Sequence, residues 1–406
     1  MLRNIVFLYF SYAISMAAPL IILPILGPRL GVAGWGVFTV AQTISIIMIA
    51  ISDFGFHVSG VRSISRRREN AIFLAETFVY VNLIKFCLAL LGAIAIFTAY
   101  YFALLPKVDF WVLVLAILAG AFQGFSLTWY YQGIEKMMMP SLCDALGKTI
   151  VVVGVYILVR GPADIWRCFA IQALAAASSF SILLILANVR FSWRSVGCKP
   201  LMACWRDAAP MGLLHLIGTL LGALQPLALA KFASSYEVGR YGASEKISRA
   251  MYSVAQPIRF AFFPRISKNA TPNSLSERNL VLSSAIMIGM ALIAGLITFD
   301  CSGWLLHVVF GRAFSSGANV LKILAALPVL TAIREGFVTQ YLIANKQEFL
   351  LIKILCATFG IGFVLIWILR GALSATEMAG VLILSESLFV ASGLFLLRRY
   401  SISVQL

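Results

Sequence analysis

Lysine and arginine side chains occur inside stretches of this 406-residue chain that are otherwise apolar enough to cross a lipid bilayer. A cation near the centre of a membrane helix costs about 2.5–3.5 kcal/mol on insertion scales. A buried acidic partner, a side chain that reaches the membrane surface, or a hydrated cavity that receives an anion can offset this cost. Six cations raise the question: Lys85, Lys148, Lys246, Arg249, Arg259 and Arg334.

Three of these cations have a simple expected explanation. Asp144 and Lys148 are spaced i, i+4, so we expect them to pair on one helix face. Lys85 and Arg259 lie near predicted helix ends, and we expect their side chains to reach the interface. These positions therefore predict no anion site.

The other three cations are less easily explained. Arg334 has Glu335 beside it, but adjacent helical side chains point about 100° apart, so its pairing stays open. Glu245 and Arg249 are spaced i, i+4 and could neutralise each other. Lys246 then has no local partner, which makes Lys246 and Arg249 the candidate anion ligands.

Polar residues follow one face of the predicted helix 238–263. Such a face is turned away from lipid, either inside a closed bundle or towards a hydrated cavity. We favour a hydrated, net-positive cavity, because the face carries two cations and one carboxylate. Its members are Gly242, Glu245, Lys246, Arg249, Ser253 and Gln256.

The composition agrees with a membrane protein. The chain is 61% hydrophobic and 12% charged, whereas about a quarter charged is typical of soluble domains. The net charge of the chain is +16. In a polytopic membrane protein such a charge is typical, because the cytoplasmic loops are rich in lysine and arginine, so we do not infer nucleic-acid binding. The seven cysteines and three histidines have no metal-site spacing, and we predict no metal and no cofactor.

Apolar runs predict an all-α integral membrane fold with about twelve transmembrane helices. Alternating loops differ in positive charge, which places both termini in the cytoplasm. No predicted loop could hold a soluble catalytic domain. The predicted spans are residues 5–26, 37–56, 78–102, 110–131, 141–159, 165–189, 210–230, 238–263, 280–299, 320–344, 349–369 and 378–397.

An internal repeat divides the chain in two. Residues 36–45 align without gaps to residues 239–248, with glycine, an aromatic, isoleucine and serine in step. We therefore expect two six-helix lobes related by a parallel repeat: residues 1–195, a cytoplasmic linker at 196–209, and residues 210–406. The repeat predicts further cavity-lining residues on the second helix: Thr39, Gln42, Thr43 and Asp53.

Four segments carry a resemblance to a known family. They are PILGPRLG at 24–31, SDFGF at 52–56, WYYQGIEKM at 129–137, and FFPRIS at 262–267 after Pro257. In these motifs, length and helix count, the chain resembles the Wzx-type O-antigen and polysaccharide flippases of the multidrug, oligosaccharidyl-lipid and polysaccharide exporter superfamily. The WYYQG element is the most specific of the four.

This resemblance implies that helices one, two, seven and eight line a central cavity. It implies alternating-access transport of undecaprenyl-pyrophosphate-linked oligosaccharide to the periplasmic leaflet of the bacterial inner membrane, alongside a polysaccharide polymerase and chain-length machinery. Lys246 and Arg249 would hold the pyrophosphate. Gln42, Thr43, Ser253 and Gln256 would bond to sugar or water. Lipid II flippases are typically longer, which disfavours a peptidoglycan precursor as cargo.

Two alternatives remain open. A cation-coupled multidrug exporter of the same superfamily would use membrane carboxylates for coupling, and Asp53, Glu76 and Glu386 are the candidates. A membrane polysaccharide polymerase or ligase would be an enzyme with a sizeable outer loop, which the chain lacks. We therefore predict a transporter and not an enzyme.

Overall fold

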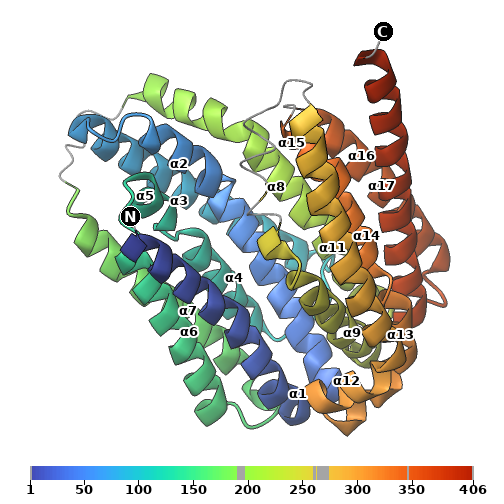
Figure 1. The fold of residues 1–406 in the computed structure, drawn as a ribbon. Coiled ribbons are helices and arrows are strands. Elements are labelled where there is room, and N and C mark those ends of the chain that lie inside the picture. Colours follow the sequence, from blue (N-terminus) through green and yellow to red (C-terminus); the bar gives the residue numbers. More distant parts are fainter. Residues whose placement is uncertain (1, 190–196, 259–261, 263–273, 345–346, 405–406) are drawn as a thin grey trace. The chain divides into compact units, whose positions relative to one another are not determined.

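The computed structural model describes residues 2–189, 197–258, 262, 274–344 and 347–404, and over these ranges it contains helices and no strand (Figure 1). Ten of the described helices are long and apolar enough to cross a membrane. The predicted all-α membrane class is confirmed. Arg259 and most of the FFPRIS segment lie outside the described ranges.

Two of the twelve predicted spans do not count separately among these ten, for different reasons. The first and second predicted helices are parts of one element, α1 (Leu2–Asp53), which is interrupted at Gly31 by a non-helical backbone with φ 65° and ψ 176°. The eighth, α9 (Ser235–Ser253), forms as a helix but carries too many charges to qualify by composition. The helices are therefore those expected, and the count differs because of one break and one polar face.

The chain forms two compact units. Unit 1 is Met1–Leu30 with Val37–Ala223, and unit 2 is Gly31–Gly36 with Leu224–Leu406. The predicted boundaries at 195 and 210 concern the repeat and stay a prediction. After α1, unit 1 contains α2 (Phe56–Ser65), α3 (Ala71–Tyr101), α4 (Phe110–Gly124), α5 (Thr128–Gly133), α6 (Met138–Leu158), η1 (Pro162–Asp164), α7 (Ile165–Ala187) and most of α8 (Cys198–Phe232).

Unit 2 begins with the end of α8 and then α9. It continues through α11 (Ser274–Asp300), α12 (Ser302–Phe310), η3 (Arg312–Gly317), α13 (Ala318–Leu324), α14 (Leu327–Ile333), the π-helical η4 (Arg334–Thr339), α15 (Gln340–Ala344), α16 (Glu348–Leu369) and α17 (Ala375–Val404).

The SDFGF segment forms the break between α1 and α2. Phe54 and Gly55 have positive φ values of 41° and 72°, which end the helix. A Cβ atom on Gly55 would lie 2.9 Å from the backbone nitrogen of Gly212, so α8 passes very close to this break. The Phe54 ring stacks on Trp205 with a centroid distance of 4.6 Å. These contacts fix α2 against the start of α8.

The WYYQG segment forms α5, which packs on α2. Trp129 is 1% exposed, and a Cβ atom on Gly60 would lie 2.6 Å from its ring. A Cβ atom on Gly133 would likewise lie 2.6 Å from Ile64. The Tyr131 hydroxyl donates to the carbonyl of Leu183 at 2.7 Å. The most family-specific segment therefore holds α2 in place by packing.

Two glycines at equivalent positions of the repeat contact each other's helices reciprocally. A Cβ atom on Gly36 would lie 1.9 Å from the carbonyl oxygen of Ser235, and one on Gly239 would lie 1.9 Å from that of Val32. Ser235, which Gly36 approaches, is four positions before Gly239. Val32, which Gly239 approaches, is four positions before Gly36. Only glycine permits this backbone approach, which supports the alignment of 36–45 with 239–248.

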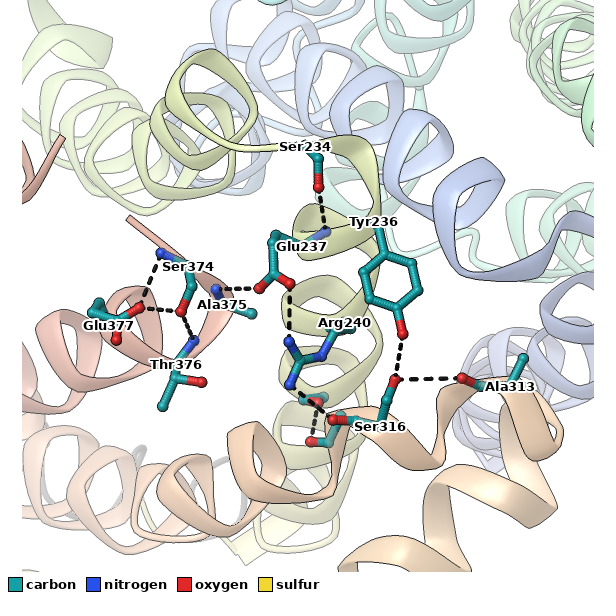
Figure 2. A network of polar contacts seen from close by, with 12 residues as sticks. Ser234, Tyr236, Glu237, Arg240, Ala313, Ser316, Ser374, Ala375, Thr376 and Glu377 are labelled. Atoms are coloured by element: carbon teal, nitrogen blue, oxygen red, sulfur yellow. Dashed lines mark hydrogen bonds and ion pairs between the residues drawn. The ribbon is translucent and has the colours of Figure 1, made fainter. Parts of the chain in front are cut away.

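A polar network at the start of α9 joins three elements of unit 2 (Figure 2). Glu237 accepts from the Arg240 guanidinium at 2.9 Å and from the backbone N–H of Ala375 at 2.8 Å. Arg240 also donates to the carbonyl of Ser316 at 2.8 Å. The Ser234 hydroxyl caps the helix by accepting from the Glu237 N–H at 3.4 Å. These bonds tie α9 to η3 and to the beginning of α17.

Replacing Glu237 by alanine should destabilise the protein by about 1–3 kcal/mol, because both the Arg240 guanidinium and the Ala375 N–H lose an acceptor. Thermal unfolding of the purified protein in detergent measures the change. Glu69→Ala is the matched control, since the exposed Glu69 has no bonded partner among the described residues and should change stability by about 0.5 kcal/mol or less. Equal unfolding temperatures of the Glu237→Ala and Glu69→Ala proteins would contradict the stabilising role of this network.

Candidate functional site

The polar face of α9 is accessible along most of its predicted length within unit 2. Lys246 and Arg249 are exposed, while Gly242 is buried against the unit. Three further residues of the predicted face are half-buried: Glu245, Ser253 and, just beyond the helix end, Gln256. The most accessible charges of this face are therefore its two cations.

The opposite face of α9 is held by hydrogen bonds to other parts of unit 2. The Ser248 hydroxyl donates to the carbonyl of Leu324 at 2.7 Å, and the Ser244 hydroxyl donates to that of Gly317 at 3.3 Å. Tyr241, fully buried, donates to the Gln225 side chain at 3.4 Å. These anchors fix the rotation of the helix, so Lys246 and Arg249 cannot turn into the unit's own core.

The two cations differ in their partners. Arg249 forms an ion pair with Glu245 at 2.8 Å, as the spacing predicts, and its side chain remains 46% exposed. Among the described residues, Lys246 forms neither an ion pair nor a hydrogen bond. An exposed, unpaired lysine beside an arginine that a carboxylate orients can present several N–H donors to one anion.

Arg334 forms ion pairs with two carboxylates, one of which could not be identified from the sequence. Its guanidinium pairs with Glu386 of α17 at 2.9 Å and with the adjacent Glu335 at 3.3 Å. Glu386 is 2% exposed, and its second carboxylate oxygen and the Arg334 Nε are buried without a bonded partner among the described residues. The coupling candidate Glu386 thus lies in a buried ion pair at the π-helical segment η4.

The charges of the polar face of α9 and of the Arg334 group balance when they are counted. Three cations (Lys246, Arg249 and Arg334) are matched by three carboxylates (Glu245, Glu335 and Glu386). The carboxylates are buried or half-buried, whereas two of the cations are exposed. The exposed surface is therefore positive although the group as a whole is neutral.

The corresponding face of α1 is less open. Thr39 and Gln42 are half-buried, and Thr43 is 6% exposed with its hydroxyl donating to the Thr39 carbonyl at 2.8 Å. Ile46, the repeat counterpart of Arg249, is 42% exposed. The accessible position is shared by both halves, and only the second half places a charge there.

Lys85 does not reach the membrane surface, so that expectation was wrong. Its ammonium group is fully buried and bonds to Asp53 at 2.9 Å and to the carbonyl of Gly124 at 3.0 Å. Asp53, expected to line a cavity, is 9% exposed and lies between Lys85 and His57 Nδ1, which is 2.5 Å from its other oxygen. The helices α1, α3 and α4 meet at this group.

Two histidines extend this group towards the surface, although no sequence motif singles them out. The rings of His57 and His215 lie 5.3 Å apart, edge to face, and both residues are exposed. Only their positions in the fold connect them, because they are 158 positions apart in the chain and no motif contains both. Asp53, His57 and Lys85 therefore form one continuous titratable group with His215 beside it.

The third coupling candidate, Glu76, lies elsewhere in unit 1. It lines a half-open cavity of about 370 Å³ between α2, α3 and the start of α8. Within the described ranges, no group of three histidine, cysteine, aspartate or glutamate side chains is arranged to hold a metal ion. The three carboxylates thus occupy three unrelated environments.

Comparison with known families gives one match over most of the chain. A family profile described as polysaccharide biosynthesis protein matches residues 1–270. Two relatives, from Shigella dysenteriae and Escherichia coli strain K12, are provisionally named O-antigen transporters, and each is 24% identical to this chain. The alignment covers 87% of this chain and 89% of the Shigella protein, and 99% of this chain and 98% of the E. coli protein.

Solved structures share the fold at low sequence identity. An inward-facing multidrug resistance transporter of the MATE family superposes with a TM-score of 0.73 at 14% identity, covering 97% of this chain and 95% of that one. The lipid II flippase MurJ superposes with a TM-score of 0.71 at 11% identity, covering 98% and 88%. These similarities confirm the predicted fold class, a helical membrane transporter fold of two lobes.

Proposed function

Since this chain belongs to the polysaccharide biosynthesis protein family, we propose that it is a flippase for a lipid-linked oligosaccharide. The cargo is a repeat unit of O-antigen or another surface polysaccharide on undecaprenyl pyrophosphate. The protein carries it from the cytoplasmic to the periplasmic leaflet of the bacterial inner membrane by alternating access. The names of the two O-antigen transporter relatives support the same cargo.

The accessible cations of α9 carry the proposal. A pyrophosphate cannot cross hydrocarbon without compensating positive charge. Lys246 is exposed and unpaired among the described residues, and Arg249 lies one turn away in an orientation that Glu245 fixes. In the proposed mechanism both cations bind the pyrophosphate, while Gln42, Thr43, Ser253 and Gln256 bond to sugar or water.

Removing these cations should abolish transport. Each charge-assisted hydrogen bond contributes about 1.5–3 kcal/mol, so Lys246→Ala or Arg249→Ala should reduce export about tenfold or more. The double variant should export almost nothing. The readout is surface polysaccharide in a strain that depends on this protein, normalised to the amount of protein in the membrane.

Two further variants sharpen this test. Lys322→Ala removes an exposed cation on α13, which contacts the Phe299 ring at 5.8 Å, and should export normally. Lys246→Arg keeps the charge and should retain most export. Full export of surface polysaccharide by the Lys246→Ala/Arg249→Ala protein would contradict the proposal.

Orientation and coupling form part of the same proposal. The basic loops support a cytoplasmic position for both termini, and a polymerase and chain-length machinery would consume the cargo on the other side. Asp53, Glu76 and Glu386 are the candidate coupling carboxylates. Asp53 is the strongest of the three, because His57 connects it to an accessible surface.

The fold similarity to a multidrug transporter favours one alternative, a cation-coupled drug exporter. Such a protein would bind cationic compounds on an acidic surface. Here the exposed charges of α9 are positive, which favours an anionic cargo. Extrusion of cationic dyes by the expressed protein, unchanged in the Lys246→Ala/Arg249→Ala variant, would support the exporter instead.

A further inference from the structure

The half-open cavity that contains Glu76 lies at the strongly basic end of unit 1. It measures about 370 Å³, within the range of small-molecule sites. Charged side chains from α2, the following turn, α3 and α8 line it: Arg62, Arg66, Arg67, Glu76 and Asp207. The cavity is built from residues of unit 1, whereas the α9 face belongs to unit 2.

The arginines of this cavity are not all neutralised. Arg62 pairs with Asp207 at 2.8 Å, which joins α2 to α8 and forms one wall. Arg67 lies over the Phe73 ring at 5.0 Å, a contact that uses the face of the guanidinium and leaves its N–H groups available. Arg66 is exposed and forms no ion pair within the described part of the chain. Two guanidinium groups can therefore donate to one anion.

Glu76 gives the cavity a second chemical character. It is half-buried on the first turns of α3, and its carboxylate has no ion pair or hydrogen bond among the described residues. Thr77 beside it is 6% exposed and also lines the cavity. A carboxylate that remains unpaired near arginines offers an acceptor to a ligand that carries N–H or O–H donors.

The position along the helices suggests where such a ligand comes from. α3 has 31 residues, whereas about 20 cross the hydrocarbon layer, so one end of it extends into the head-group region. The arginine run that precedes α3 marks this end, because basic residues next to membrane helices lie at the lipid phosphates.

We propose that this cavity binds the phosphate-bearing head of a membrane lipid. The phosphate contacts Arg66 and Arg67, and an ammonium or sugar hydroxyl of the same head donates to Glu76. Two lipids have this chemistry: phosphatidylethanolamine and a lipid-linked oligosaccharide. The second source rests on the proposed function, and there the cavity would be the place where the cargo is first held.

Lipid binding to the purified full-length protein in detergent micelles tests the assignment by native mass spectrometry. The probes are phosphatidylethanolamine, phosphatidic acid and an undecaprenyl-pyrophosphate-linked sugar. Arg66→Gln/Arg67→Gln should lower occupancy by every probe at least tenfold. Glu76→Gln should weaken the two donor-bearing probes and leave phosphatidic acid as tight or tighter, since the head group of that lipid has neither an ammonium nor a sugar hydroxyl.

The controls separate binding from folding and from transport. Arg68→Gln removes a neighbouring arginine that pairs with Glu135 at 2.6 Å and does not line the cavity, so it should bind like the unmodified protein. Lys246→Ala/Arg249→Ala should also bind phosphatidylethanolamine and phosphatidic acid normally here, whether or not it exports. A preference for either donor-bearing lipid supports the assignment and identifies its source. Equal occupancy in the Arg66→Gln/Arg67→Gln variant and the unmodified protein overturns it.

Discussion

Replacing Lys85 by methionine should destabilise the protein by about 3–5 kcal/mol, the cost of breaking a buried ion pair from one side. The ammonium group is fully buried, and its removal leaves the nearly buried Asp53 carboxylate with the His57 ring as its remaining side-chain partner among the described residues. Two carbonyl oxygens, of Gly124 and Ser126, also lose a donor. Chemical or thermal unfolding in detergent measures the loss.

The more exposed pair Asp144–Lys148 is the matched control for this prediction. Its atoms are as close, at 2.6 Å, but the two side chains are 41% and 31% exposed. Lys148→Met should therefore cost about 1 kcal/mol or less. Asp53→Asn combined with Lys85→Met should recover part of the lost stability, because no uncompensated charge remains. A double variant less stable than Lys85→Met alone would show that the pair itself is not the cause.

Alanine at Gly36 or Gly239 should destabilise the protein by about 1–3 kcal/mol or more, because the new Cβ atom must displace a backbone carbonyl. Either methyl group would lie 1.9 Å from an oxygen in the present geometry. Both substitutions open the same contact between α1 and α9. We therefore expect the double variant to lose clearly less than the sum of the single losses.

Gly218→Ala in α8 is the control for these substitutions. A Cβ atom there meets nothing within 4 Å, so alanine should stabilise the helix by about 0.4–1 kcal/mol. Unfolding of the four variants and the unmodified protein under one set of conditions completes the comparison. Strict additivity of Gly36→Ala and Gly239→Ala would mean that the two glycines do not share one contact.

Features that depend on local sequence were predictable. Length and apolarity identified the membrane helices, and the i, i+4 spacing identified the pairs Asp144–Lys148 and Glu245–Arg249. The alignment of two ten-residue segments puts Gly36 and Gly239 at equivalent positions, and these two glycines contact each other's helices. In each case the interaction partners lie on one helix or on repeated elements.

Features that depend on which helices adjoin were not predictable. Lys85 pairs with Asp53 across 32 positions, and Arg334 pairs with Glu386 across 52. A single sequence does not show which helices are neighbours. A lysine that is buried in an ion pair therefore cannot be distinguished in the sequence from one whose side chain reaches the membrane surface. The predicted helix 320–344 likewise forms three helical segments and a π-helical turn, with Pro328 and the buried pair of Arg334 at the breaks.

The reciprocal glycine contact has the geometry of a two-fold interface between identical subunits, in which residue i of one copy touches residue j of the other and the converse also holds. In such a homodimer, one codon change would alter both sides at once, and neither side could vary alone. Here the two copies are joined in one chain, so each position has its own codon. Lysine and arginine could thus arise on the second copy's polar face, at positions where the first copy has threonine and isoleucine. A symmetric contact within one chain therefore leaves either side free to carry charge alone.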